Sequence, residues 1–248
     1  MITIILPAYN EEKSLPQLIS QIRILAESQL TEKIVILVVD DGSTDRTAEC
    51  VNNLVGNDIL LVQHQGNKGL GQAIKTGFNE ALRSFPDTRL IVTMDSDNTH
   101  PPSLLLPMVK AIEAGSDVVI ASRYRRGARV VGLSWDRKVM SLGMSWMFRL
   151  ILPIRGVRDY SCGYRVYKSQ FIQEGIIRWG DQFVSQTGFS CMVEILLKLN
   201  QLHAIFYEVP LILRYDLKQG RSKMNVRVTI QKTIKLLYQE RMRLLLNK

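Results

Sequence analysis

The segment Asp95-Ser96-Asp97 carries two carboxylates, two residues apart, directly after the apolar run at 90–94. Alternate side chains of extended backbone share a face, so both carboxylates are expected to point the same way. Two hard oxygen ligands of this kind suit Mg²⁺ or Mn²⁺, which completes its octahedron with water and substrate phosphates. A divalent ion there would neutralise the diphosphate leaving group of a glycosyl or phosphoryl transfer. Aspartates are also common in turns, so this pattern alone is a weak signal.

A second pair of carboxylates, Asp40 and Asp41, follows the apolar run at 34–39. The residues after them have an ordinary structural explanation, because Gly42 suits a positive-φ turn and the hydroxyl of Ser43 or its neighbour caps a helix. Two carboxylates at the end of a buried strand are costly unless they bind a partner, such as ribose hydroxyls or the edge of a base. The pair therefore predicts a nucleoside-binding turn.

A glycine-containing segment at 67–71, Asn-Lys-Gly-Leu-Gly, precedes a stretch of helical period. Its backbone N–H groups would face a phosphate, or the segment simply begins a helix. It matches neither G-x-G-x-x-G nor the G-K-[ST] ending of a P-loop, so dinucleotide-binding and P-loop folds are disfavoured.

These segments need elements to position them, and the chain alternates between strand-length and helix-length patterns. Short apolar runs stand at 2–6, 34–39, 59–63, 90–94, 117–121 and 204–209, and segments of helical period stand at roughly 12–29, 44–55, 69–84 and 102–114. This order predicts one α/β domain with a Rossmann-like, mainly parallel sheet flanked by helices. Ligands gather at the carboxyl ends of such strands, so we expect the acidic segments to open onto one crevice.

Composition and charge limit the classes of protein to which this chain can belong. The chain has 248 residues, of which 46% are hydrophobic and 22% charged, which suits one large domain and argues against a disordered chain. The net charge of +9 is regional: residues 1–120 hold nine basic and fifteen acidic residues, 121–160 hold nine and two, and 217–248 hold nine and one. An acidic half followed by basic stretches suggests carboxylate chemistry beside surfaces that meet phosphates or anionic lipid.

Three distant cysteines give no metal-type spacing, so a reducing compartment is the expectation. The N-terminal segment has the pattern of a strand and not of a signal peptide. No stretch reaches the roughly 18 uncharged apolar residues that a spanning helix needs. We therefore expect a cytoplasmic protein that is not integral to a membrane.

Taken together and in order, four motifs resemble glycosyltransferase family 2. They are Pro7-Ala8-Tyr9-Asn10-Glu11, Asp40-Asp41-Gly42-Ser43-Thr44-Asp45, the segment 67–71, and Asp95-Ser96-Asp97 followed by His100-Pro101-Pro102. Later segments are similar to the dolichol-phosphate mannose synthase branch of that family: Ala121-Ser122-Arg123-Tyr124, Trp135-Asp136-Arg137 with Ser141, 159–165, and Gly220-Arg221-Ser222-Lys223. The resemblance covers roughly residues 2–225.

The resemblance implies a GT-A fold, a nucleotide-diphosphate sugar donor such as GDP-mannose or a UDP-sugar, Mg²⁺ or Mn²⁺, a polyprenyl phosphate acceptor and inversion at the anomeric carbon. Within that pattern Asp95 and Asp97 hold the metal and diphosphate, and Arg123 and Arg137 hold the acceptor phosphate. The other expected binding residues are Pro7, Tyr9, Glu11, Asp40, Asp41, Ser96 and Lys223, the last in a loop that closes over the diphosphate.

Two positions depart from the family pattern. Thr99 stands where a Gln often supplies a further metal ligand, and Leu217 stands where an Arg is common. Metal coordination is therefore expected to be leaner, and Lys218 or Arg221 is expected to supply the missing charge.

The expected mechanism needs no protein base, because a lipid phosphate is already an anionic nucleophile near neutral pH. Arg123 and Arg137 would position it for in-line attack and screen its repulsion from the diphosphate. The planar fork of Arg binds phosphate oxygens in pairs, which suits this role. The alternative for these arginines is an ordinary salt bridge in a basic stretch.

Two apolar and basic segments are candidates for contact with a membrane surface. Residues 138–154 are too short and interrupted to span it. Residues 226–248 are expected to form a basic amphipathic C-terminal helix beside the GT-A domain at 1–225. Helices that cover the core or a homo-oligomer seam would show the same patterns. The expectation is peripheral attachment to the cytoplasmic face of a membrane.

Three other functions are alternatives to sugar transfer onto a polyprenyl phosphate. Transfer to a soluble saccharide or other hydroxyl acceptor would need a general base, and the paired arginines argue against it. Nucleic-acid binding is disfavoured, because the basic tail has Tyr238 as its only aromatic and the acidic half repels a phosphate backbone. The intact Asp95 and Asp97 disfavour a non-catalytic sugar-nucleotide binder. The sugar, the base and the polyprenol length depend on details that these motifs do not specify.

Overall fold

The structure is a computed structural model that describes residues 1–54, 56 and 58–217. The expected helix at 226–248, the boundary at 225, and the candidate residues Lys218, Arg221 and Lys223 lie outside the described residues.

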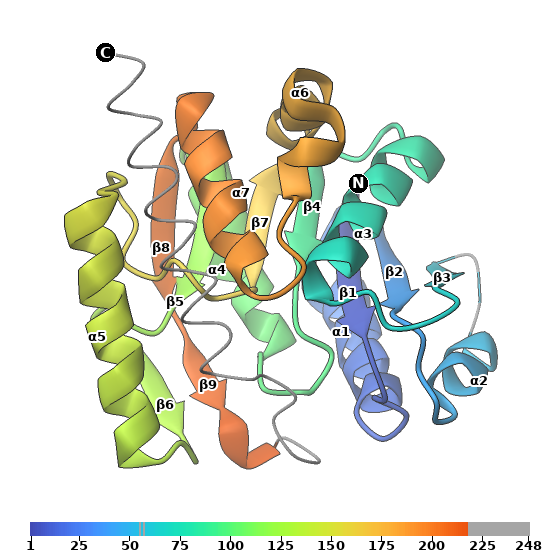
Figure 1. Cartoon of the computed structure of the whole chain (residues 1–248). Helices are drawn as coiled ribbons and strands as arrows, with labels where there is room; N and C mark the ends of the chain where they lie inside the picture. The colour runs from blue at the N-terminus through green and yellow to red at the C-terminus, as the bar shows by residue number, and fades with distance from the viewer. Residues whose placement is uncertain (55, 57, 218–248) are drawn as a thin grey trace.

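Seven strands form one mixed sheet in the order β3-β2-β1-β4-β7-β5-β8 (Figure 1). Six of them match the apolar runs of the sequence: β1 (Ile2–Ala8), β2 (Ile34–Asp40), β3 (Ile59–Gln63), β4 (Leu90–Thr93), β5 (Val118–Ser122) and β8 (Phe206–Pro210). The first four are parallel neighbours, and β5 pairs in parallel with β8. β2, β4 and β5 are buried throughout, which explains why their sequences are apolar on both faces.

One strand was not predicted from the sequence. β7 (Arg165–Lys168) lies between β4 and β5 and is antiparallel to both. Its four residues begin with a wholly buried arginine, Arg165, so they do not form an apolar run. Two further short strands, β6 (Arg129–Val131) and β9 (Ile212–Arg214), make a separate two-stranded parallel sheet.

Helices cover both faces of the large sheet (Figure 1). α3 (Leu70–Ser84), α6 (Ser169–Trp179) and α7 (Ser190–Gln201) pack together on one face, and α1 (Leu15–Gln29) and α4 (Leu105–Glu113) lie on the other. α2 (Thr47–Asn52) follows β2, and three 3₁₀ turns complete the described chain: η1 (Pro102–Leu104), η2 (Gly180–Val184) and η3 (Tyr215–Leu217). The predicted α/β architecture is confirmed.

The apolar segment expected at 138–154 forms α5 (Trp135–Ile151), which lies at the β8 end of the sheet (Figure 1). One face of α5 packs inward through Ser145 and Phe148. Large apolar side chains on α5 are also exposed at spacings of four and three residues, namely Trp135, Val139, Leu142, Trp146 and Leu150. This spacing places them along one stripe, called the α5 stripe below. Within the described residues, no helix is both long enough and apolar enough to cross a membrane.

Candidate active site

The carboxyl ends of β1, β2 and β4 meet at one edge of the sheet, as the sequence predicts. The backbone N–H of Asp41 donates to the carbonyl of Ala8 at 2.8 Å, which joins β2 to β1. The hydroxyl of Ser96 donates to the carbonyl of Pro7 at 2.8 Å, which joins the loop after β4 to β1. Two of the predicted binding residues, Pro7 and Ser96, therefore contact each other.

The loops after β1 and β2 are also bonded to each other. The side-chain oxygen of Asn10, a residue with φ of 54°, accepts the N–H of Thr44 at 2.8 Å, and the N–H of Glu11 donates to the hydroxyl of Thr47 at 2.8 Å. Tyr9 and Glu11 are only partly buried in this joined pair of loops. Both residues therefore lie at the predicted edge, where a nucleoside would bind.

Asp40 receives its partners from within the chain. Its carboxylate accepts the N–H of Ser43 at 3.0 Å and the side-chain amide of Gln63 at 3.3 Å. The expectation that Ser43 or Thr44 caps a helix is wrong, because α2 begins only at Thr47 and its N-cap residue is Arg46. The Ser43 hydroxyl instead accepts the N–H of Asn10 at 2.9 Å. The hydroxyl thus joins two loops.

Asp41 is buried and accepts hydrogen bonds from the start of α3. Its two oxygens accept the N–H groups of Lys68 at 2.9 Å and Gly69 at 2.8 Å. The N–H of Gly71 donates to the carbonyl of Thr187 at 2.9 Å. Three N–H groups of the segment 67–71 therefore already have partners within the chain, which favours the alternative that this segment simply begins a helix. The anion at this helix start is the protein's own carboxylate.

The Asp95-Ser96-Asp97 segment has one carboxylate that is partly exposed and one that is buried. Thr99 donates to Asp97 Oδ1 through its hydroxyl at 2.6 Å and its N–H at 3.2 Å. The ring of His100 accepts the N–H of Asp95 through Nδ1 at 3.3 Å. Thr99 therefore uses its hydroxyl to orient Asp97, at the position where the family often has a metal-binding Gln.

The donor set at this segment fits a metal that shares its ligands with the substrate. The described residues contain no group of three or more His, Cys, Asp or Glu side chains arranged to hold an ion. Two carboxylates, Asp95 and Asp97, are the usual protein contribution to an Mg²⁺ site that substrate phosphates complete. The residues present therefore suit an ion that arrives with a diphosphate.

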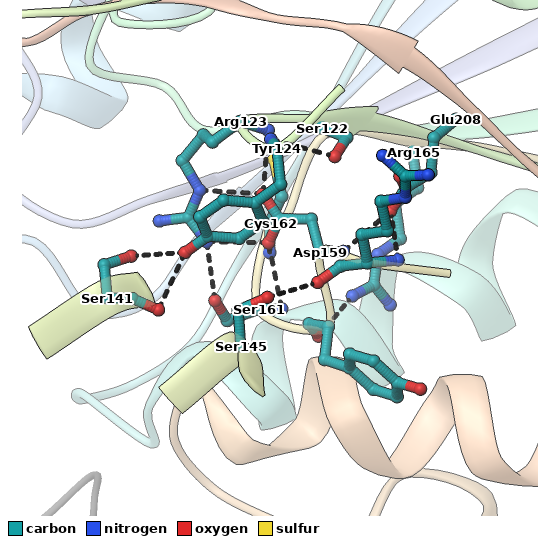
Figure 2. A network of polar contacts seen from close by, with 12 residues as sticks. Ser122, Arg123, Tyr124, Ser141, Ser145, Asp159, Ser161, Cys162, Arg165 and Glu208 are labelled. Atoms are coloured by element: carbon teal, nitrogen blue, oxygen red, sulfur yellow. Dashed lines mark hydrogen bonds and ion pairs between the residues drawn. The ribbon is translucent and has the colours of Figure 1, made fainter. Parts of the chain in front are cut away.

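Arg123, which follows β5, forms a two-point ion pair with the wholly buried Asp159 (Figure 2). Its Nε and Nη2 lie 2.8 and 2.7 Å from the two carboxylate oxygens, and Nη2 also donates to the Ser161 hydroxyl at 2.7 Å. Burial opposes ionisation of Asp159, but the charge and hydrogen bonds of Arg123 outweigh it and lower the pKa of that carboxyl. The alternative that Arg123 forms an ordinary salt bridge therefore holds for its Nε and Nη2 atoms. Nη1 donates no hydrogen bond within the described chain.

A second buried carboxylate, Glu208 on β8, supports the same loop (Figure 2). Its Oε1 accepts the N–H groups of Arg158 at 2.6 Å and Asp159 at 2.7 Å. Its Oε2 is buried and has no hydrogen bond among the described residues. Burial and the nearby charge of Asp159 raise the pKa of Glu208. The sequence motif 159–165 included Asp159, but nothing in the sequence linked either carboxylate to Arg123.

The loop that carries Asp159 reaches both sides of the site. Ser161 bonds Arg123, and a Cβ at Gly163, two residues later, would lie 2.9 Å from Asp95 Oδ1. β4 and β5 are both antiparallel to β7 and therefore parallel to each other, so Asp95 and Arg123 follow strands that end at the same edge.

Arg137 is exposed on α5, and none of the ion pairs among the described residues includes it. Four residues later on the same helix face, the Ser141 hydroxyl lies 2.6 Å from the hydroxyl of Tyr124, the neighbour of Arg123. The two predicted arginines are therefore brought to neighbouring places, although only Arg137 is exposed.

The end of the described chain also reaches the site. The N–H of Arg214 on β9 donates to the carbonyl of Thr99 at 3.1 Å. Leu217, at the position where the family commonly has Arg, lies three residues further on and is exposed. A cavity of about 310 Å³ lies elsewhere, between α3, α6 and η2, and Phe78, Ile176 and Phe183 are among its lining residues.

The fold and the acidic edge are those of a GT-A glycosyltransferase domain. The sequence matches the model of glycosyl transferase family 2 over residues 3–190, so the chain belongs to this family. It is 33% identical over 199 residues to a dolichol-phosphate mannosyltransferase of Pyrococcus furiosus, which is 79% of this chain and 52% of the relative. It is also 33% identical over 174 residues to an undecaprenyl-phosphate 4-deoxy-4-formamido-L-arabinose transferase of Proteus mirabilis, which is 69% of this chain and 50% of the relative.

A solved structure supports the fold. Glucosyl-3-phosphoglycerate synthase of Mycobacterium tuberculosis, in complex with Mn²⁺, UDP-glucose and phosphoglyceric acid, aligns with a TM-score of 0.65 and 18% identity. The alignment covers 97% of this chain and 79% of that one. The chain spans about half the length of the two relatives matched by sequence.

Replacing Glu208 by Gln should change how stability depends on pH. The folded state holds the Glu208 proton to a higher pH than the unfolded state does, because burial raises its pKa above 4.5. The stability of the wild type relative to Glu208→Gln should therefore fall as pH rises above 4.5, and level off above the raised pKa. Urea unfolding of both proteins across this range measures it. A difference that stays constant with pH would contradict the assignment.

Proposed function

We propose that this chain transfers a sugar from a nucleotide-diphosphate sugar to a polyprenyl phosphate with inversion, and that mannose from GDP-mannose is the first sugar to test. The observation that carries the proposal is the loop 159–163, which contacts Arg123 at one end and lies against Asp95 at the other. A carboxylate suited to a metal diphosphate and an arginine suited to a phosphate are thereby held at one edge of the sheet.

The chemistry follows from the charges at this edge. A lipid phosphate is an anion near neutral pH, so it can attack the anomeric carbon while the nucleoside diphosphate leaves. Arg137, whose charge has no carboxylate partner among the described residues, would bind the acceptor phosphate and orient it for in-line attack. A bound Mg²⁺ or Mn²⁺ would neutralise the departing diphosphate.

Arg123 suits a narrower role in phosphate binding than an arginine without a carboxylate partner would. Asp159 already neutralises its charge, and the Nε and Nη2 groups are occupied. One nitrogen, Nη1, is left to donate to an acceptor oxygen. We therefore assign the larger share of phosphate binding to Arg137.

The sequence relatives support the acceptor class more firmly than the sugar. One is a dolichol-phosphate mannosyltransferase, and the other is an undecaprenyl-phosphate transferase of a modified arabinose. A polyprenyl phosphate is common to both descriptions, whereas the sugars differ. Mannose therefore stays a first choice, with UDP-glucose and UDP-N-acetylglucosamine as further donors to test.

A lipid acceptor also explains the α5 stripe, because an enzyme that acts on a lipid needs a surface that contacts the membrane. Its exposed apolar side chains lie on the helix that carries Arg137, and the guanidinium of Arg149 lies 4.9 Å from the ring centre of Trp146. Apolar residues with interleaved arginines are typical of helices that lie in a membrane interface. We propose that α5 rests on the membrane and that attachment is peripheral.

A donor screen tests the proposed reaction. The protein is incubated with polyprenyl phosphate, Mn²⁺ and radiolabelled GDP-mannose or UDP-sugars, and the label is followed into the organic phase. Transfer is expected from one donor, and it should disappear in EDTA and in Asp97→Asn, which keeps an oxygen for the Thr99 hydroxyl but removes the charge. Label that moves only to soluble hydroxyl acceptors would support the competing function, and full activity in EDTA would contradict the metal.

Substituting Arg137 by Ala should weaken binding of the lipid phosphate and leave binding of the sugar donor unchanged. Losing one charged hydrogen-bond partner typically costs about 1.5–3 kcal/mol, so KM for polyprenyl phosphate should rise roughly 10- to 150-fold. Arg178→Ala, which removes an exposed arginine from α6 on another part of the surface, is the matched control. Equal increases in KM for both substrates would count against the assignment.

Membrane contact by α5 should depend on its exposed apolar stripe. Trp146→Ser combined with Leu150→Ser should reduce co-sedimentation with phosphatidylglycerol–phosphatidylcholine vesicles by at least tenfold, since each large apolar side chain contributes up to about 1.5–3 kcal/mol when buried. Ile177→Ser removes an equally exposed side chain from α6 and should have no effect. Unchanged sedimentation of the double variant would show that α5 does not make the contact.

A further inference from the structure

His64 is a buried histidine that the proposed mechanism does not use. It follows β3, and only 6% of its side chain is exposed. Its Nδ1 lies 2.7 Å from Asp41 Oδ1, and its Nε2 lies 3.0 Å from the hydroxyl of Thr76 on α3. A neutral ring satisfies both contacts if Nδ1 donates to the carboxylate and Nε2 accepts from the hydroxyl.

The partners of Asp41 leave its carboxylate with one acceptor position. Oδ1 serves both His64 and the N–H of Lys68, and Oδ2 accepts the N–H of Gly69. A carboxylate offers about four such positions. Among the described residues, three are therefore taken, and the fourth lies on Oδ2.

The backbone around Asp41 has little room to adjust. Gly69 has φ of +89°, and a Cβ there would lie 2.4 Å from the carbonyl oxygen of Thr187. A Cβ at Gly71 would lie 1.7 Å from the carbonyl oxygen of Gln186. The start of α3 is thus packed directly against the backbone of 186–187, so the N–H groups that meet Asp41 are fixed. Among the described residues, His64 is the one side chain that hydrogen-bonds the Asp41 carboxylate.

We propose that His64, held by Thr76, is a positioning residue of the donor site. It fixes the plane of the Asp41 carboxylate, so that the remaining acceptor position on Oδ2 keeps one orientation toward a hydroxyl or N–H group of the nucleoside. This inference rests on the proposed function, which places the nucleoside at Asp41. Its structural half, the coupling of His64 to the start of α3, holds without any ligand.

The ligand-free half is tested by amide hydrogen exchange. In His64→Leu, the Asp41 carboxylate loses one partner, and the N–H groups of Lys68 and Gly69 should exchange faster. Gln63→Leu, one residue earlier, removes a partner of Asp40 instead and should leave both amides unchanged. Unchanged exchange at Lys68 and Gly69 in His64→Leu would overturn the inference, whatever nucleotide binding shows.

Nucleotide binding tests the other half. GDP and UDP, each with Mn²⁺, are titrated calorimetrically into the wild type and into His64→Leu, His64→Asn and Asp41→Asn. The same titrations are made with the double variant that combines His64→Leu and Asp41→Asn. The nucleotide that binds the wild type should bind His64→Leu roughly 10- to 150-fold more weakly. His64→Asn, which places an N–H donor near the position of Nδ1, should recover much of that affinity and keeps the test valid if the leucine variant does not fold.

The double variant separates positioning from a merely structural role. If His64 acts through Asp41, its removal should add little once Asp41→Asn is present. Fully additive losses, or wild-type affinity in His64→Leu, would overturn the inference while leaving the proposed function intact. Failure of the wild type to bind either nucleotide would contradict the proposed function and this inference together.

Discussion

A carboxylate stays buried at low cost only where hydrogen-bond donors or a cation surround it, and this constraint sets the shape of the candidate site. Asp41 gathers the end of β2, the residue after β3 and the start of α3. Asp159 and Glu208 do the same for the loop after α5, one through Arg123 and the other through two backbone N–H groups. The loops are ordered by charges that face inward, which leaves Asp95 and Arg137 as partly or fully exposed groups at the edge.

The sequence was sufficient for the elements whose periodicity is strong. The six apolar runs became strands within two residues of their expected bounds, because a parallel strand buried on both faces needs a continuous apolar run. The joining of the loops after β1, β2 and β4 was also predictable, since parallel strands bring their carboxyl ends to one edge. β7 was missed because Arg165 is buried by hydrogen bonds to the carbonyls of Tyr160 and Met192, which no hydropathy pattern reveals.

The roles of individual polar residues were harder to predict. Burial of Asp40 and Asp41 correctly implied that they need partners, but the sequence could not distinguish a ligand from groups of the chain itself. The N–H partners of Asp41 are 27 and 28 residues away, and Asp40 accepts the side-chain amide of Gln63, 23 residues away, besides the nearby N–H of Ser43. The pairing of Arg123 with Asp159 is hidden for the same reason, because 36 residues separate them. Family motifs named both positions, yet only the folded chain shows that one neutralises the other.

The place of β7 in the sheet has a consequence for how the chain matures during synthesis. β5 is complete at Ser122, but both of its neighbours, β7 and β8, come from residues 165–168 and 206–210. A nascent chain therefore carries an apolar strand without a hydrogen-bonding neighbour until about 40 further residues have been made. The pairing of β7 with β4 and β5, which brings Asp95 and Arg123 to one edge of the sheet, is thus a late folding step between residues distant in sequence. Such steps are slow and leave the chain exposed to aggregation. A ribosome-bound fragment that ends between β5 and β7 would be a natural client for chaperones.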